Sequence, residues 1–290
     1  MASSGTSNGW DHNGQGWLRP QLVAFTLLAE QVLPRDVAVF SGSFIHVFAR
    51  VGIGEHATRA TLARMVQRDL LVRHRRGRRV YLSMTPRCRA ILADGHRRIW
   101  ELGAVNESRH ADWTILAFSL PESWQRERHG LRRRLSWAGF GPLYNGVWIA
   151  PSEPTAVGPL VEELGLDAHV HVFRVAADPV TDLREIAREA YDLDALAAAY
   201  RDFIGRWGDR PLDRPADDPL ALTLRLSTEW LRVLRDDPRI PIDLLPPGWP
   251  AVPAQQLFRA LHASNAGAAS KVAAQILDTI APPAEDSRSA

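Results

Sequence analysis

The sequence predicts an α+β protein of three domains: an N-terminal winged helix-turn-helix, a ferredoxin-like middle domain and a helical C-terminal domain. Helical spacing of apolar residues gives way to an arginine-rich strand pair over residues 72–85. Residues 110–178 then follow the order β-α-β-β-α-β. After residue 180 the apolar spacing is helical again, and 290 residues suffice for such domains of ordinary size.

The N-terminal domain, residues 18–104, is predicted to begin with three helices. The first covers residues 21–33, and the second starts after Ser41, which is a good N-cap. The third covers residues 55–69, with apolar residues on one face and polar residues on the other. This is the helix order of a helix-turn-helix, in which the third helix recognises DNA.

A β-hairpin and a fourth helix follow in the same domain. Val80, Leu82 and Met84 alternate with more polar residues at the two-residue period of a strand. Gly77, flanked by arginines, is the expected turn of the hairpin. A helix that ends near Trp100 completes the domain, and the hairpin is the wing.

Positive charge is concentrated in this region. Residues 50–110 contain 14 Arg and five acidic residues, whereas the whole chain has a net charge of only +2. Such clustering favours a polyanionic partner, and we predict double-stranded DNA. The predicted DNA contacts are His56, Arg59, Thr61, Arg64, Gln67, Arg73, Arg75, Arg76, Arg78 and Arg79. The alternative is that the hairpin tip is only a solvated turn and the helices only a small core.

The middle domain, residues 110–178, contains strands in WTILAFS, in GFGPLYNGVWIAP and in HVHVFRV, with helices between them. His169 and His171 alternate with valines, so they are expected on one face of the last strand. Two histidines on one face suit metal ligation. Because the sequence offers no acidic or cysteine partner nearby, we favour a role at the surface or at a dimer interface.

The C-terminal domain, residues 180–281, is predicted to be helical. A polar, Pro-rich loop over 208–218 and the Pro-rich segment DDPRIPIDLLPPGWP separate its helices. The terminal segments, 1–17 and 282–290, have the composition of disordered tails.

Several classes of protein are disfavoured by the sequence. No apolar run is long enough for a transmembrane helix, and the N-terminus has no signal-peptide pattern, so we expect a soluble, cytoplasmic protein. No common catalytic or nucleotide-binding motif occurs, so we expect neither an enzyme nor a cofactor. Cys88 is the only cysteine, so an internal disulfide is excluded. Its thiol could sense redox conditions, but we favour the interpretation that it is a buried packing residue.

Five segments spread over residues 20–265 resemble the PaaX family of bacterial transcriptional repressors: GIGEHATRATLARMVQRDLL, RRGRRVYLSMT, LRRRLSWAGFGPLYNGVWIAP, AYDLDALAAAYRDF and TEWLRVLRDDPRIPIDLLPPGWP. The resemblance implies a homodimer that represses phenylacetic acid catabolic genes and is released from its operator by an aryl-CoA thioester such as phenylacetyl-CoA. Arg59, Thr61 and Arg64 stand at positions that match the family's motif. An activator or dual regulator with another ligand is an alternative.

A thioester effector needs cations for its phosphates and an apolar slot for its acyl group. The candidates are Arg132, Arg133 and Arg134 for the phosphates, and Trp148, Tyr191 and Trp230 for the slot. The alternative for these aromatic residues is ordinary core packing.

The middle domain also resembles CRISPR-associated ferredoxin-like nucleases, which hold a divalent metal with an aspartate at the end of the first strand. Here Ser119 stands at that point, and a hydroxyl is a poor substitute for a charged oxygen ligand. We therefore interpret the middle domain as a dimerisation domain and disfavour a metal-dependent nuclease. A hydrolase acting on CoA thioesters is disfavoured as well, because the sequence shows no carboxylate or nucleophile constellation for it.

Overall fold

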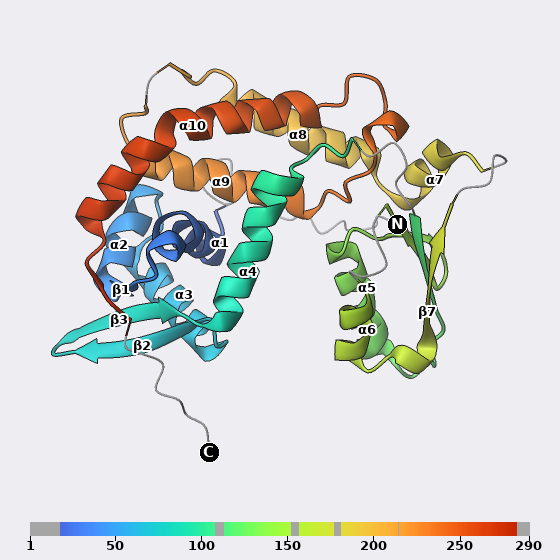
Figure 1. Cartoon of the computed structure of the whole chain (residues 1–290), viewed down its shortest axis with the longest axis horizontal. Coiled ribbons are helices and arrows are strands. Elements are labelled where there is room, and N and C mark those ends of the chain that lie inside the picture. The colour runs from blue at the N-terminus through green and yellow to red at the C-terminus, as the bar shows by residue number, and fades with distance from the viewer. Residues whose placement is uncertain (1–17, 108–112, 152–156, 177–180, 214, 283–290) are drawn as a thin grey trace, which may run out of the picture. The chain divides into compact units, whose positions relative to one another are not determined.

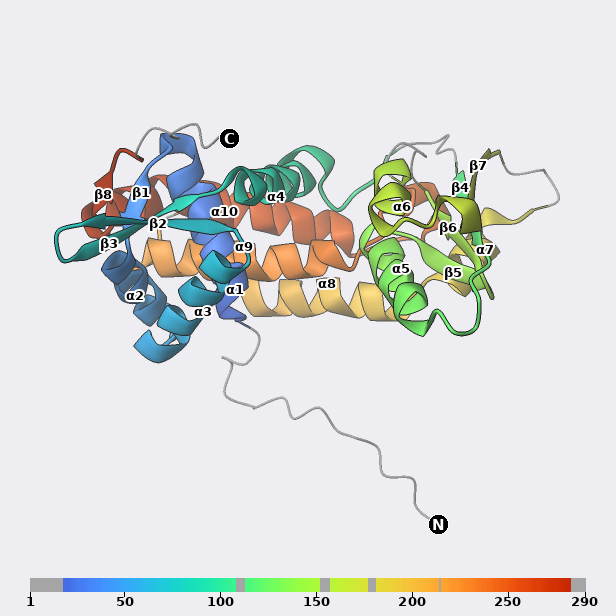
Figure 2. The same cartoon turned by 90° about the horizontal axis from the view of Figure 1, so that it is seen from below.

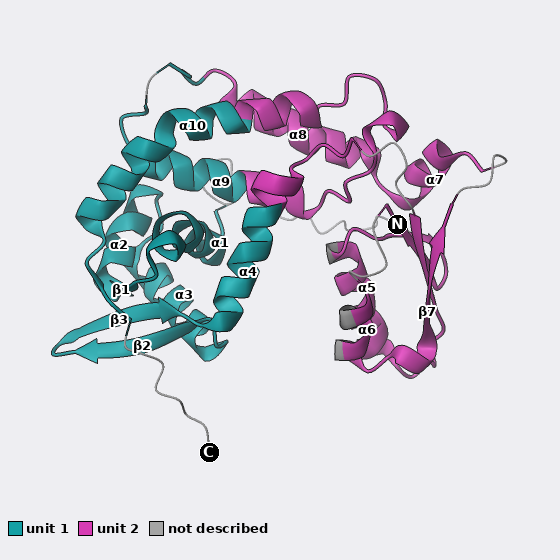
Figure 3. Cartoon of the chain, in the orientation of Figure 1, with its two compact units in different colours: residues 1–97, 210–229, 258–290 teal, residues 98–209, 230–257 magenta. Residues whose placement is uncertain are grey.

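The computed structural model describes residues 18–107, 113–151, 157–176, 181–213 and 215–282. The chain forms two compact units, each built from separate stretches of sequence (Figure 3). Unit 1 comprises residues 1–97, 210–229 and 258–290, and unit 2 comprises residues 98–209 and 230–257. The segment predicted as a C-terminal domain is thus divided between the units. The predicted tails lie outside the described residues, except for Pro282.

Unit 1 begins with the three expected helices (Figure 1). They are α1 (Pro20–Leu27), α2 (Ser41–Arg50) and α3 (Glu55–Gln67). The single helix predicted over residues 21–33 is instead α1 followed by a π-helical turn (Leu28–Val32) and a 3₁₀ turn (Leu33–Arg35). After the hairpin, α4 (Pro86–His96) continues into a second π-helical turn (Arg97–Leu102).

The β-sheet of unit 1 has four strands in the order β2-β3-β1-β8. The predicted hairpin consists of β2 (Leu71–Arg76) and β3 (Arg79–Met84), and it extends away from the helices of the unit (Figures 1 and 2). Two further strands, β1 (Ala38–Phe40) and β8 (Thr279–Ile280), pair antiparallel beside it. Strands of three and two residues are too short to show a period in the sequence, so they were not predicted.

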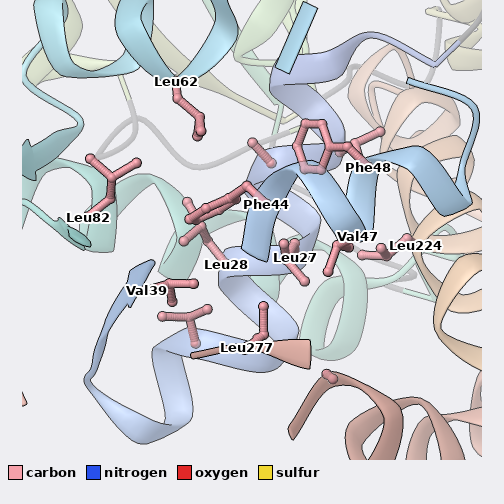
Figure 4. Close-up of a cluster of buried hydrophobic side chains, with 14 of the residues drawn as sticks. Leu27, Leu28, Val39, Phe44, Val47, Phe48, Leu62, Leu82, Leu224 and Leu277 are labelled. Atoms are coloured by element: carbon pink, nitrogen blue, oxygen red, sulfur yellow. The ribbon is translucent and has the colours of Figure 1, made fainter. Parts of the chain in front are cut away.

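The core of unit 1 joins residues from both ends of the chain (Figure 4). Phe44 and Phe48 of α2 are fully buried, with ring centroids 6.4 Å apart. Leu224 and Leu277, which lie more than 150 residues later, belong to the same cluster. Because burying a leucine side chain contributes about 2 kcal/mol, these late residues stabilise the N-terminal helices directly.

Unit 2 contains the predicted β-α-β-β-α-β arrangement, a mixed α+β fold that fits the ferredoxin-like class. Its elements in chain order are β4 (Trp113–Phe118), α5 (Gln125–Trp137), β5 (Gly141–Tyr144), β6 (Val147–Ala150), α6 (Gly158–Leu164) and β7 (Val170–Val175). All neighbouring strands pair antiparallel, in the order β5-β6-β4-β7. The two helices cover one face of this sheet, where Leu116 packs with Leu131, Leu135 and Val161 (Figures 1 and 2).

The later helices are α7 (Leu183–Ala190), α8 (Leu193–Trp207), α9 (Pro219–Arg235) and α10 (Ala251–Ile276), with a 3₁₀ turn at Ile242–Leu244. Ala190 of α7 packs against Trp113 and Ile149, on the face of the ferredoxin-like sheet opposite its two helices. Within the described residues, none of the helices has the length and apolar character needed to cross a membrane.

Candidate nucleic-acid interface

The exposed face of α3 has polar residues around small ones. His56, Arg59, Arg64 and Gln67 are all exposed, and Ala60 and Ala63 lie among them. The opposite face is buried: Thr58, Leu62 and Met65 are at most 6% exposed. Small alanines at the centre of a polar face let a helix backbone approach a partner closely, while the longer side chains reach out on either side.

Both arginines of α3 are oriented by neighbours on the same helix. Arg59 Nη2 lies 2.6 Å from Oε1 of Glu55, and its Nε donates to the same oxygen at 2.7 Å. Arg64 Nη2 donates to the hydroxyl of Thr61 at 3.1 Å. The Arg59 pair is well exposed, so water and salt weaken it, and the guanidinium can exchange Glu55 for another acceptor.

Thr61 does not lie on this exposed face. Its side chain is 1% exposed, because it stands three residues after Thr58 and four before Met65, on the buried side of the helix. The expectation that Thr61 contacts a partner directly is therefore wrong. Its observed contact is with Arg64, whose guanidinium it helps to position.

The wing follows α3 almost at once. Only residues 68–70 separate the helix from β2, and Leu70 N donates to Met65 O at 2.9 Å. At the tip, Arg76 pairs with Arg79, so Gly77 and Arg78 form a two-residue turn. Gly77 has φ +59°, which suits the first central position of a type II′ turn and disfavours other residues there. The recognition-helix candidate and the hairpin are thus held close together.

The wing arginines lie on two faces of the hairpin. Arg73 and Arg75 stand opposite Leu82 and Val80, which belong to or pack against the core, so these two share the core-facing side. Arg76 and Arg79 stand opposite each other on the other side, and Arg78 is in the turn. All five of these arginines are exposed.

Arg79 differs from the other wing arginines because the C-terminal segment engages it. Its Nη1 lies 2.6 Å from Oδ2 of Asp278, next to β8, and its guanidinium lies 5.3 Å from the ring centre of Phe40. Tyr81 Oη donates to the same carboxylate at 3.2 Å. Asp278 is 199 residues away in sequence, and no local pattern predicts this contact.

Replacing Asp278 by Asn should release Arg79 and tighten DNA binding about two- to threefold at low salt, the order expected for one exposed charge near a phosphate. The gain should shrink as salt rises. Because the ion pair is exposed, the free energy of unfolding should change by less than about 1 kcal/mol. Fluorescence anisotropy and thermal unfolding measure both effects. Asp217→Asn, an exposed change in the same unit, is the control; an equal gain in the control would contradict a specific role for Asp278.

Cys88 is a packing residue. Its side chain is fully buried in the core of unit 1, and burial raises the pKa of the thiol to about 11, against a smaller opposing effect of Arg89. A neutral thiol with a raised pKa supports the fold fully at neutral pH, and this contribution falls only as the pH rises from about 9 towards 11.

The native protein should therefore react with Ellman's reagent at pH 8 at least about 100-fold more slowly than the protein unfolded in guanidinium. The shift in pKa alone lowers the thiolate fraction by about this factor. Absorbance at 412 nm follows the reaction. Similar rates for the native and unfolded protein would contradict the buried position and support a redox-sensing thiol.

The structure does not bring the six predicted effector residues together into one site. Arg132 and Arg133 are exposed on α5, and Arg134 is half-buried. Trp148 packs in the core of the ferredoxin-like domain, and Trp230 is fully buried against Tyr200 and Phe203. For the two tryptophans, the core-packing alternative describes what is observed.

Tyr191 lines a cavity of unit 2. Its hydroxyl donates towards Ile149 O at 2.8 Å and Gly139 O at 3.0 Å.

The two histidines of the middle domain do not share a strand face as predicted. His169 belongs to a 3₁₀ turn (Asp167–His169) that precedes β7, and its ring lies 5.0 Å from that of Trp124. His171 is exposed on β7, with its ring centre 6.5 Å from that of Phe173. Over the described part of the chain, no group of three or more His, Cys, Asp or Glu side chains is arranged to hold a metal. Ser119 follows β4, and its amide donates to His169 O at 3.0 Å.

Three family models match successive segments of the chain and define its class. The model of a PaaX-like protein matches residues 19–88, that of the central Cas2-like domain of the PaaX protein matches residues 106–187, and that of the PaaX-like C-terminal domain matches residues 191–275. Together they cover most of the chain. The chain belongs to the PaaX family.

Individual relatives agree with this assignment. The transcriptional repressor PaaX of Escherichia coli K12 is 26% identical over 244 residues, which are 80% of this chain and 76% of that protein. This relative is a transcriptional repressor, the class of protein that the sequence resemblance predicted. The structure of the uncharacterized protein Rv0674 from Mycobacterium tuberculosis has the same fold, with a TM-score of 0.57 and 21% identity over 90% of this chain and 99% of that one.

Proposed function

We propose that the chain is a DNA-binding transcriptional repressor whose unit 1 acts as a winged helix-turn-helix. The observation that carries the proposal is the exposed polar face of α3, held beside a hairpin that bears five exposed arginines. In a winged helix-turn-helix, the third helix enters the major groove and the hairpin contacts the backbone or the minor groove.

The exposed residues of α3 take the specific contacts. Arg59 and Arg64 present guanidinium groups that can donate two hydrogen bonds to one guanine, and His56 and Gln67 extend the same face. Thr61 supports Arg64 from the buried side. In the absence of DNA, Arg59 is paired with Glu55. A base that binds the Arg59 guanidinium has to displace this carboxylate.

The wing arginines take contacts to phosphate. Arg73, Arg75, Arg76 and Arg78 are exposed and have no acidic partner among the described residues. Arg79 contributes less, because Asp278 already neutralises it. Several such contacts make binding strongly dependent on salt.

The regulatory part of the proposal rests on the family resemblance. The protein acts as a homodimer on a pseudo-palindromic operator of a phenylacetic acid catabolic operon, and an aryl-CoA thioester such as phenylacetyl-CoA releases it. The exposed Arg132 and Arg133 of α5, with Arg134 beside them, remain candidates for the phosphates of such an effector.

Fluorescence anisotropy with labelled DNA from the region upstream of the gene tests this proposal. We expect tight, salt-sensitive binding that phenylacetyl-CoA reverses and coenzyme A does not. DNA binding that phenylacetyl-CoA does not change would contradict the proposed effector but would still support a DNA-binding repressor. If expression of a reporter gene rises with the protein, the chain is an activator.

A further inference from the structure

Unit 2 contains a cavity of about 340 Å³. Its walls come from the turn between α5 and β5, from the start of α8 with the preceding Tyr191, and from the last turns of α9. All of these elements belong to the same compact unit. The cavity is at the small end of the range of ligand sites, so it fits one ring with a short substituent and not a whole coenzyme A.

The lining is mainly aromatic and small. Phe140 and Tyr200 are at most 3% exposed, Tyr191 closes one side, and Ala195 and Ala199 leave space along α8. The hydroxyl of Tyr200 donates to Asp237, a residue outside the lining, and the hydroxyl of Tyr191 donates to backbone carbonyls. Since both hydroxyls already have acceptors, these rings offer the cavity mostly apolar surface.

One cation lines the same cavity, and it lacks an acceptor. Arg232 is half-buried, and its Nε is buried without a hydrogen-bond acceptor among the residues that the structure describes. Because this Nε is closed to solvent, a molecule in the cavity meets the outer nitrogens of the guanidinium. Leaving a buried charged donor unpaired is unfavourable. Its neighbour Arg235 is different, because Nε of that side chain donates to Asp236 at 3.2 Å.

The two carboxylates at the cavity already have partners. Asp192 accepts from the amide of Ala195 at 2.9 Å as the N-cap of α8, and Asp236 accepts from Arg235. Neither contacts Arg232 in the described structure. An acceptor oxygen in the cavity can therefore pair with the outer nitrogens of the Arg232 guanidinium, at the edge of an aromatic wall.

We propose that this cavity is the effector pocket and that it takes a small aromatic group carrying an acceptor oxygen, which Arg232 binds. A free aryl carboxylate and the aryl-acyl end of a thioester share this chemistry. In the second case the rest of the thioester lies outside the pocket. The inference deepens the proposed repressor function, on which its regulatory meaning rests.

Isothermal titration calorimetry of the full chain without DNA tests the pocket. The probes are phenylacetate, phenylacetyl-CoA and coenzyme A. We expect one of the two aryl probes to bind and coenzyme A alone not to bind. Arg232→Gln should weaken binding about 10- to 100-fold, as loss of a charged hydrogen bond does. Arg235→Gln, one turn further along the same helix, should leave binding unchanged.

A second variant fills the space and leaves the charge in place. Ala199→Phe should abolish binding of the aryl probe, with circular dichroism as the check of folding. If the Ala199→Phe variant does not fold, the affinity of Arg232→Gln for the aryl probe is the test of the pocket. Binding of phenylacetate identifies a free acid, and binding of the thioester alone identifies an acyl thioester.

Three results would overturn the inference: neither aryl probe binds, Arg232→Gln binds as tightly as the natural protein, or a folded Ala199→Phe binds normally. Fluorescence anisotropy of labelled DNA, measured without ligand, distinguishes a failure of the effector pocket from a failure of the proposed repressor function. DNA binding with no aryl binding rejects the pocket alone, and aryl binding with no DNA binding rejects the repressor alone.

Discussion

Replacing Arg59 or Arg64 by Ala should remove sequence discrimination while leaving the fold intact. Arg59 and Arg64 are exposed on α3. In the proposed complex each guanidinium donates two hydrogen bonds to a guanine, a contact that contributes about 1–3 kcal/mol of discrimination. We therefore expect affinity for the upstream DNA to fall about 10- to 100-fold per substitution and affinity for a random duplex to fall far less. Competition anisotropy with the two duplexes measures this ratio.

The stability of the protein should hardly respond to these substitutions. Arg59 is 65% exposed and paired with Glu55 in the i,i+4 geometry, a contact that contributes at most about 0.5 kcal/mol. Arg201→Ala, an exposed change on α8 of unit 2, is the matched control and should leave both affinities unchanged. An equal loss on specific and random DNA would show that Arg59 and Arg64 contact phosphates and not bases.

The second large effect is expected at the wing tip. Replacing Arg76 and Arg78 together by Ala should weaken binding to every DNA sequence by a similar factor. It should also reduce the slope of log K against log salt by about 2, because each lost phosphate contact removes about 0.9. Titrations at four salt concentrations with both duplexes give the slopes.

Arg79→Ala is the matched comparison for the wing. Its side chain already pairs with Asp278, so its removal should change the slope by clearly less than 1. A slope that stays unchanged in the Arg76 and Arg78 double variant would contradict the proposal that the wing tip contacts phosphates.

Local periodicity was enough to predict much of the fold. The alternation of Val80, Leu82 and Met84 around the turn at Gly77 predicted the hairpin, which the structure contains with Gly77 in its turn. The order β-α-β-β-α-β was predicted in the same way, because each element has its own apolar pattern. These features depend on neighbours in sequence, which a single sequence displays.

Features that depend on distant residues were not predictable. The pairing of β8 with β1 and the contact of Asp278 with Arg79 join the two ends of the chain. Leu224 and Leu277 complete the core of the N-terminal helices, so the residues predicted to form the C-terminal domain are shared between the two compact units. Apolar periodicity predicts that one face of a helix is buried, but it does not identify the element against which that face packs.

The candidate site was predicted in part. The exposed positions of His56, Arg59, Arg64 and Gln67 follow from helical spacing, and the same spacing applied to Thr61 would have placed it beside Thr58 on the buried face. Among effector residues, aromatic type alone could not distinguish a core tryptophan from a pocket wall. Arg232 was missed because its place in the cavity wall depends on elements that are distant in sequence.

The central claim is that α3 enters the major groove, and photo-crosslinking tests it most directly. Ala57 is small and exposed on α3, so Ala57→Cys can carry an azidophenacyl group, while the buried Cys88 should stay unlabelled. We predict crosslinks to bases in the major groove of the upstream DNA, and none from the same label on Ala198→Cys of α8. If the labelled protein binds DNA and position 57 crosslinks no more than position 198, α3 is not the recognition helix.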